Sequence, residues 1–445
     1  MAGTRQSHIK AAARGDILLV NAFQKQGGAA RAAYRIFEGI KRFYPNAHYL
    51  TLFRDDARSD ISGVRRRSLL GWLADRLSAI ESRPVRKYRS QREPRFTPAF
   101  WANPLRIPLA RLKPRLVHLH WLGAGVASLD ELARIDVPVI WTLHDAWPFT
   151  GGCHYTGTCD GYQRHCGTCP QLDSDEIGDL SHIVWQRKQR IYKKIAPVIV
   201  APSHWLAEIA GQSSLLAGRR IEVIANGLDL TLFKPADRDR ARAHFGLPAE
   251  ETILLFGAHQ LTDPRKGGDL LRAALDRIDF PCHLVTFGSG ALSLASTKYV
   301  TVQAVAPVDD DAELALLYSA ADVFVCPSRE DNLPNMVAEA LACATPCVAF
   351  EINGIPEMIC HERNGFLAQP FAVDELVAGI RWVAQHPAPQ ALRDAARRKA
   401  VESFDRDKMA ERYAALYSEL LPVPAAPRAA MDCVYSVAID AAYPR

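Results

Sequence analysis

The chain has 445 residues, a hydrophobic content of 48%, a charged content of 23% and a net charge of +5. This is the composition of an ordinary soluble globular protein, and the length is too great for one typical core, so two domains are expected. No apolar run approaches the length that spans a bilayer, which excludes a chain anchored by membrane-spanning helices. Residues 1–15 are polar and lack the apolar region of a secretory signal, so we expect a flexible N-terminus on a cytoplasmic protein.

Strands and helices are expected to alternate through the first half of the chain. Residues 16–22 form an apolar run that predicts a buried strand, and Gly27 and Gly28 follow it at the start of a helix that extends to about residue 43. Further strands are expected at residues 48–53, 116–120, 137–143 and 198–201. This alternation predicts a parallel sheet covered on both faces. The two glycines would let a phosphate or sugar approach the backbone, although they would serve the turn equally well.

Residues 64–96 are strongly basic. They contain ten Lys or Arg and three Asp or Glu, so their net charge of +7 exceeds that of the whole chain, and they include apolar residues such as Trp72 at roughly helical spacing. A basic amphipathic helix suits an anionic membrane surface, whereas a helix packed on its own domain with a solvated basic face explains the pattern equally well. No nucleic-acid-binding module is recognisable, so no nucleic acid partner is expected.

Polar and aromatic residues follow two neighbouring strands of the first half. His120 and Trp121 end one strand, and His144 and Asp145 end the next. A histidine at the carboxyl end of a strand can reach a ligand or simply cap the strand. An aromatic ring there can stack on a sugar or pack in the core. We assign His120 and Trp121 to the acceptor side of the expected site.

Four cysteines lie close together in the loop of residues 151–170. They are Cys153, Cys159, Cys166 and Cys169. A disulfide framework does not suit a reducing cytosol, and buried thiols are the alternative. The last two cysteines have the Cys-x2-Cys spacing that is typical of zinc sites. We expect a closed, structural zinc site rather than a catalytic one.

The alternation of strands and helices starts again in the second half. Strands are expected at residues 252–257, 283–288, 300–303, 322–326 and 347–350, and helices at 267–278, 311–321 and 406–421. The turn-rich residues 226–235 are a candidate hinge, and the Ala- and Pro-rich residues 422–445 are expected to be loose. The pattern predicts two doubly wound domains in series, at residues 16–228 and 229–405, with ligands at the carboxyl ends of the strands.

The most informative segment is an acidic loop within residues 327–346, between a buried strand and a helix. Glu330 and Asp331 lie in the loop, and Glu339 lies in the first turns of the helix. Free amides at a helix start can hold an anion, and carboxylates accept hydrogen bonds from sugar hydroxyls. A nucleotide sugar presents both groups. The acids would also favour the positive end of the helix dipole without binding any ligand.

A second turn of this half carries two adjacent cations. Arg265 and Lys266 lie between a strand and a helix, within residues 263–268. Transfer from a nucleotide sugar releases a diphosphate, whose developing negative charge the site must stabilise. Two cations at a helix start can meet two phosphates, although an exposed basic turn is also common.

These motifs, in this order, resemble the GT-B glycosyltransferases of the large retaining family four, over about residues 17–421. The family's acidic pair, eight residues apart, corresponds to Asp331 and Glu339, but its first acid is usually glutamate. The resemblance implies two Rossmann-like domains that face a cleft and are joined at Asn226-Gly227. It also implies a last helix, residues 406–421, that crosses back onto the first domain.

The resemblance also assigns roles to residues. It implies that Asp331 and His144 lie near the donor sugar, Glu339 near the ribose, and Lys266 against the diphosphate. The family usually has an arginine just after the preceding strand, where this chain has residues 258–260, so either Arg265 compensates or one diphosphate contact is lost. The catalytic candidates are His144, Arg265, Lys266 and Asp331, and the donor-binding candidates are Gly27, Gly28, Glu330, Asn332, Leu333, Glu339, Asn353 and Gly354.

By this resemblance, the protein would be a retaining transferase that moves a sugar from a nucleotide-diphosphate sugar to a glycan, commonly lipid-linked in bacteria. The Thr-Gly-x-Cys loop after the His-Asp pair is similar to that of a subset of bacterial exopolysaccharide glycosyltransferases. No cofactor is expected for catalysis, and the membrane contact would be peripheral, on the inner face of the cytoplasmic membrane. The rivals are a nucleotide-sugar epimerase on the same fold and a non-catalytic scaffold that binds sugar or membrane.

Overall fold

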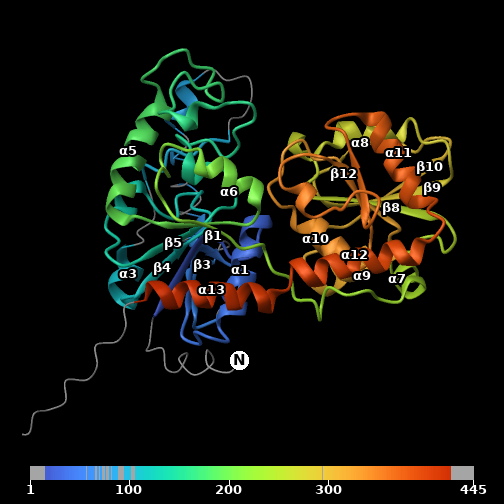
Figure 1. Ribbon diagram of the computed structural model, residues 1–445, viewed down its shortest axis with the longest axis horizontal. Helices are drawn as coiled ribbons and strands as arrows, with labels where there is room; N and C mark the ends of the chain where they lie inside the picture. Colours follow the sequence, from blue (N-terminus) through green and yellow to red (C-terminus); the bar gives the residue numbers. More distant parts are fainter. Residues whose placement is uncertain are drawn as a thin grey trace, which may run out of the picture.

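The structure is a computed structural model that describes residues 16–56, 58–65, 68–69, 71–72, 76, 80–81, 83–88, 95–101, 106–292 and 294–421. Figure 1 shows two α/β domains side by side, the first coloured blue to green and the second yellow to red. Each domain is built around one parallel sheet. The predicted fold class, two doubly wound α/β domains, is confirmed.

The first sheet has seven parallel strands in the order β3-β2-β1-β4-β5-β6-β7. They are β1 (Ile17–Phe23), β2 (His48–Arg54), β3 (Ile61–Arg65), β4 (Leu116–Leu119), β5 (Val139–Thr142), β6 (Val198–Ala201) and β7 (Ile221–Val223). The direction of winding reverses between β1 and β4. In open α/β sheets this reversal leaves a crevice beyond the carboxyl ends of the strands, where ligands bind.

The second sheet has six parallel strands in the order β10-β9-β8-β11-β12-β13. They are β8 (Thr252–Gln260), β9 (Cys282–Ser289), β10 (Val300–Val305), β11 (Val323–Cys326), β12 (Cys347–Phe350) and β13 (Gly365–Ala368). Its winding reverses between β8 and β11, so the turns that follow these two strands share one crevice.

Amphipathic helices cover the sheets. In the first domain they are α1 (Gly28–Ile40), α3 (Arg106–Leu112), α4 (Leu129–Leu132), α5 (Leu180–Ile195) and α6 (His204–Gly211). In the second domain they are α7 (Arg238–Phe245), α8 (Gly268–Leu275), α9 (Asp311–Ala320), α10 (Asn335–Ala342), α11 (Val373–Ala384) and α12 (Pro389–Ser403). The last helix, α13 (Arg406–Leu420), leaves the second domain and runs beneath the sheet of the first (Figure 1).

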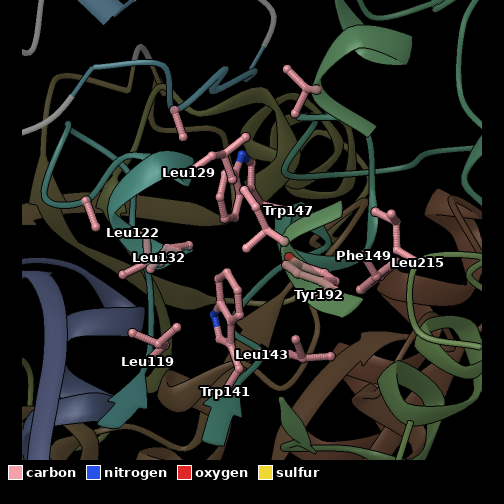
Figure 2. Packing of buried hydrophobic residues seen from close by; sticks show 14 of the residues in the cluster. Leu119, Leu122, Leu129, Leu132, Trp141, Leu143, Trp147, Phe149, Tyr192 and Leu215 are labelled. Atoms are coloured by element: carbon pink, nitrogen blue, oxygen red, sulfur yellow. The ribbon is translucent and has the colours of Figure 1, made fainter. Parts of the chain in front are cut away.

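A dense aromatic core supports the strand that carries His144. Trp141, at the end of β5, is fully buried, and its ring centroid lies 5.8 Å from the rings of both Trp147 and Tyr192 (Figure 2). Leucines such as Leu129 fill the space around these rings. Large aromatic side chains contribute much of the buried apolar area of such a core, so the end of β5 is held rigidly.

The chain passes between the domains twice, and the two crossings lie against each other. The Leu228 amide donates to the Phe404 carbonyl at 2.7 Å, and the Arg406 amide donates to the Leu228 carbonyl at 3.0 Å. The Arg406 guanidinium also pairs with Asp229 at 2.9 Å. Beyond this point, α13 places the Tyr417 hydroxyl 2.6 Å from the imidazole of His118 in β4. Helix α13 therefore completes the core of the first domain.

Candidate functional site

The two turns that carry Lys266 and Asp331 meet at the reversal point of the second sheet. Lys266 lies in the turn after β8, Asp331 lies in the loop after β11, and their side chains form an ion pair. Gly267 allows this approach because its φ is +70° and a Cβ atom there would lie 1.9 Å from the Pro327 carbonyl oxygen. The sequence therefore brings a cation and a carboxylate together at the mouth of this crevice.

The acidic loop is held by contacts within the second domain and by one contact from the first domain. The Asp331 amide donates to the side-chain oxygen of Asn353 at 3.2 Å, and a Cβ atom at Gly354 would lie 2.0 Å from the Asn332 carbonyl oxygen. The Ser203 hydroxyl, from the first domain, donates to the side chain of Asn332 at 2.7 Å. Leu333 is buried in the core of the second domain. These contacts hold the loop in one shape between the two domains.

Glu339 is 2% exposed and both of its carboxylate oxygens accept hydrogen bonds. One oxygen accepts from Arg35 Nη2, in α1 of the first domain, at 2.8 Å, and the other accepts from the Tyr318 hydroxyl at 3.0 Å. Burial opposes the charge on Arg35, but the carboxylates of Glu339 and Asp311 outweigh burial and raise its pKa. Arg35 is therefore a charged partner that reaches Glu339 from the other domain.

The glycine turn of the first domain abuts the start of α10. Gly27 caps α1 with a φ of 89°. The carbonyl of Gly28 accepts a hydrogen bond from the Asn335 side chain at 2.9 Å. Two helix starts with unsatisfied amides thus lie close together across the domain boundary, and Figure 1 shows α1 on the side of the first domain that faces α10.

Arg265 contacts both its own turn and the loop of residues 151–170, which we call the cysteine loop. Its guanidinium pairs with Asp263 at 2.6 Å and lies 3.8 Å from the ring centroid of Tyr155. Burial opposes its charge, but Tyr155, Asp263 and Asp331 raise its pKa. The guanidinium therefore stays charged near the acidic loop while it stacks on an aromatic ring of the first domain.

Glu330 joins the acidic loop to the cysteine loop, close to the contact that Arg265 makes with Tyr155. Its carboxylate accepts a hydrogen bond from the Gly157 amide at 3.4 Å. Burial raises the pKa of Glu330, while the Gly157 amide and the charge of Arg265 act in the opposite direction. Tyr155 and Gly157 of this loop thus lie against the turns that follow β8 and β11.

His144 and His120 form a neutral pair at the strand ends of the first domain. Their ring nitrogens lie 3.1 Å apart. Burial lowers the pKa of His144 to about 4, although the charge of Asp145 opposes the shift, and burial also lowers the pKa of His120 well below its usual value. Nε2 of His120 is buried and has no hydrogen-bond partner among the described residues.

Trp121 is tied to the same corner of the first domain. Its indole nitrogen donates to the Asp145 carboxylate at 2.8 Å. The same carboxylate lies 2.6 Å from a ring nitrogen of His154. Its ring stacks on Phe23 at 5.9 Å between centroids. These contacts fix the orientation of the indole, so its position is set before any ligand arrives.

The lowered pKa values of His120 and His144 lead to a pH dependence of stability. His120 and His144 have folded pKa values below the unfolded value of about 6.5, so between pH 6.5 and about 4 the unfolded chain binds protons that the folded chain does not. The free energy of unfolding should therefore fall as the pH decreases through this window, by up to about 1.4 kcal/mol per pH unit for each histidine. Urea titrations at several pH values should show that the free energy of unfolding depends less on pH in His120→Asn than in the wild type. His244→Gln, at an exposed position, should keep the wild-type dependence on pH.

The four cysteines of the 151–170 loop are gathered beside α5. Burial raises the pKa of the Cys153 thiol, and the thiols of Cys169, Cys166 and Cys159 raise it further. The Gly161 amide donates to the sulfur of Cys159 at 3.4 Å. Among the residues that the structure describes, no three His, Cys, Asp or Glu side chains are placed so that they could hold a metal ion. A metal would require these thiols to draw closer together than they are here.

Several residues of the site were not found from the sequence. They are Arg35, Arg95, Tyr155, Ser203 and Tyr318, and all but Tyr318 reach the site from the first domain. For Arg35 a signal was present, because it lies on the buried face of α1 beside apolar residues. A basic residue on the apolar stripe of a helix needs a buried partner, and here that partner is Glu339.

The basic segment at residues 64–96 is only partly described. Its Arg66 and Arg67 lie outside the described residues, as do Leu70, Leu73 and Leu77 of its predicted apolar face. Trp72 is 51% exposed and Leu69 is 74% exposed, and the guanidinium carbon of Arg76 lies 4.9 Å from a ring centroid of Trp72. Throughout the described part of the chain, no helix combines the length and apolar character needed to cross a membrane.

Sequence comparison identifies relatives for both domains. The family described as "Glycosyltransferase Family 4" matches residues 26–232, and "Glycosyl transferases group 1" matches residues 250–386. D-inositol 3-phosphate glycosyltransferase 1 of Catenulispora acidiphila is 32% identical over 360 residues, which are 76% of this chain and 79% of that protein. The D-inositol 3-phosphate glycosyltransferase of an Arthrobacter strain is 30% identical over 57% of this chain and only 58% of its own length. The putative colanic acid biosynthesis glycosyl transferase WcaC of Escherichia coli is 24% identical over 69% of this chain and 77% of that protein.

Solved structures share the architecture. The Anabaena protein Alr3699/HepE, solved in complex with UDP and glucose, aligns with a TM-score of 0.62 at 18% identity and covers 92% of this chain and all of that one. At this identity the likeness shows the fold, and that fold is GT-B. The matches to both domains, together with the Catenulispora relative, show that the chain belongs to glycosyltransferase family 4.

Proposed function

We propose that this glycosyltransferase is a retaining enzyme that transfers a sugar from a nucleotide-diphosphate sugar to a hydroxyl of a glycan. The observation that carries the proposal is the ion pair of Lys266 and Asp331 at adjoining strand ends of the second sheet. Glu339 lies on the helix that follows, α10, whose start contacts the glycine turn of the first domain. The Anabaena neighbour was solved with UDP and glucose, which supports a nucleotide sugar as the donor class.

In this proposal each donor group meets a chemically matched residue. Glu339 accepts hydrogen bonds from the ribose hydroxyls, and Asp331 accepts them from the sugar. Lys266, which pairs with Asp331 in the structure, provides the cation that stabilises the leaving diphosphate together with Arg265 and the helix amides. No divalent metal is needed for this step.

The acceptor side is formed by His120 and Trp121, with His144 between them and the donor. Because its pKa is lowered to about 4, His144 is neutral at physiological pH and can exchange hydrogen bonds with sugar hydroxyls without adding charge. The acceptor hydroxyl attacks from the face that the diphosphate leaves, and the leaving phosphate accepts its proton. The similarity to WcaC, named for colanic acid biosynthesis, supports an extracellular polysaccharide as the product.

The direct test is a screen of nucleotide sugars followed by a transfer assay. The true donor should raise the melting temperature, because a ligand that binds only the folded state stabilises it. Transfer to a glycan acceptor should keep the anomeric configuration of the donor sugar, as read by NMR. Inverted product would overturn the retaining mechanism. Conversion of the donor without an acceptor would favour an epimerase, and donor binding without turnover would favour a scaffold.

We also propose that the four cysteines of residues 151–170 hold a structural zinc ion. Burial raises the pKa of the Cys166 and Cys169 thiols, but nearby backbone groups oppose this rise, and the Gly161 amide donates to the sulfur of Cys159 at 3.4 Å. Such hydrogen bonds favour thiolates, the form in which cysteine binds zinc. The metal would brace the loop that carries Tyr155 and Gly157 to the second domain.

Purified protein should therefore contain about one zinc ion per chain by elemental analysis. Chelation should lower the melting temperature, whereas turnover should not require added zinc. Cys169→Ser should lose the metal, and Cys360→Ser, at an exposed cysteine outside the loop, should keep it. Metal-free wild-type protein with four titratable thiols in the loop would rule this site out.

A lipid-linked acceptor would bring the protein to the inner face of the cytoplasmic membrane, and residues 64–96 are the proposed contact. Each basic residue near an anionic leaflet contributes about 1 kcal/mol, and salt screens the attraction. The protein should co-sediment with anionic liposomes more than with neutral ones and should be released at high salt. Reversing Arg65, Arg66 and Arg67 to Glu should weaken this binding.

The charge-matched control reverses three exposed arginines of the second domain, Arg240, Arg277 and Arg398. Equal binding to both kinds of liposome would remove the case for a membrane contact.

A further inference from the structure

The partner of Glu339 comes from the other domain. Arg35 lies in the third turn of α1, and its Nη2 lies 2.8 Å from one Glu339 oxygen and 3.4 Å from the Asp311 carboxylate. Arg31, one turn earlier, pairs with the other oxygen of Asp311 at 3.1 Å but is not bonded to Glu339. The four side chains form a neutral cluster of two cations and two carboxylates, in which only Arg35 touches Glu339.

Glu339 and Arg35 can each form further hydrogen bonds. A carboxylate has about four acceptor positions, and Arg35 and Tyr318 use two of those on Glu339. The Nη1 atom of Arg35 is buried and has no hydrogen-bond partner among the described residues. Burying a guanidinium nitrogen without a hydrogen-bond partner costs free energy, so we expect a ligand to accept a hydrogen bond from Nη1.

We propose that Arg35 is a positioning residue for the donor nucleotide: it holds the Glu339 carboxylate in the orientation that receives the ribose hydroxyls and offers Nη1 to the same nucleotide. The inference rests on the proposed function, in which Glu339 binds ribose. Because Glu339 is almost fully buried beneath Arg35, the nucleotide must enter while the two domains are apart. Closure of α1 onto α10 then completes the ribose site.

A comparison of ribonucleotides with 2′-deoxyribonucleotides tests this role directly. Titration calorimetry would measure the dissociation constants of UDP, GDP and ADP, and of dUDP, dGDP and dADP. For at least one base, the wild-type protein should bind the ribonucleotide about tenfold more tightly, the usual effect of one hydrogen bond to a charged group. Arg35→Leu should reduce this ratio to about one, and Arg35→Lys should give an intermediate ratio.

Two further variants separate positioning from a merely structural role. Arg31→Leu removes a neighbouring cation that does not touch Glu339, so it should keep the wild-type preference for ribose. Tyr318→Phe removes the other partner of Glu339 and should lower the preference in part. If Arg35→Leu does not fold, Arg35→Lys and Tyr318→Phe carry the test.

The outcomes distinguish this inference from the proposed function. Full ribose preference in a folded Arg35→Leu, or tighter nucleotide binding in that variant, would overturn the positioning role and leave the donor assignment intact. Wild-type binding with no preference for ribose would also overturn it. If none of the three ribonucleotides binds the wild-type protein, the proposed donor class fails and the inference fails with it.

Discussion

Replacement of Lys266 with alanine is expected to lower the turnover of sugar transfer by about ten- to a hundredfold at saturating donor and acceptor. Lys266 lies at the reversal point of the second sheet, paired with Asp331, where it would face the leaving diphosphate. The negative charge of that group increases in the transition state, so the loss should appear mainly in kcat. Lys266→Arg, which keeps the charge, should recover part of the rate.

Arg277→Ala is the matched control for this prediction. Arg277 is also a cation of the second domain, but it is exposed and pairs with Asp374. Its loss should leave turnover unchanged. Wild-type turnover in a folded Lys266→Ala protein, as judged by its melting temperature and circular dichroism, would contradict the assignment of Lys266 to the diphosphate.

Replacement of Glu339 with alanine is expected to cost about 3–5 kcal/mol of stability, because it leaves the Arg35 charge buried without its closest carboxylate. Asp311, at 3.4 Å from Arg35, would remain and should place the cost at the lower end of this range. Unfolding in urea, followed by tryptophan fluorescence, measures the change. Transfer activity should fall at the same time, since Glu339 is the proposed ribose acceptor.

A double-mutant cycle separates the ion pair from simple loss of packing. The double variant Arg35→Met, Glu339→Met replaces both charges with apolar side chains of similar size and should be more stable than either single variant. If the effects of the two single changes were simply additive, the two residues would not interact across the domain boundary.

The strands that the sequence predicted well are those with continuous apolar runs. The expected strands at residues 198–201 and 347–350 coincide with β6 and β12, which lie one position inside the sheet edges and are almost wholly buried. The strands β3, β7 and β13 were not predicted. All three lie at the edges of their sheets and are only partly buried, so none carries the long apolar run of a central strand.

In the site, too, residues that follow a predicted element were found from the sequence, whereas residues that arrive from the other domain were not. Lys266 and Asp331 each stand next to a strand end that the local pattern reveals, so their proximity could be predicted, and Glu339 lies on the helix that follows. Arg35 and Tyr155 reach the same place from the first domain, and no local pattern states how two domains dock. The sequence likewise gave no sign that Arg265 would stack on Tyr155 and pair with Asp263.

The two crossings between the domains make the second domain an insertion within the first. Residues 229–405 leave and return at one point, where Leu228 and Asp405 form a β-bridge, and α13 then supplies Tyr413 and Tyr417 as hydrogen-bond partners of Thr142 and His118. During synthesis, the first domain therefore remains unfinished until the final helix emerges. Truncation before residue 406 would damage the first domain rather than the second domain, to which the deleted segment is adjacent in sequence. The second domain of another member of the family could be exchanged at this single point.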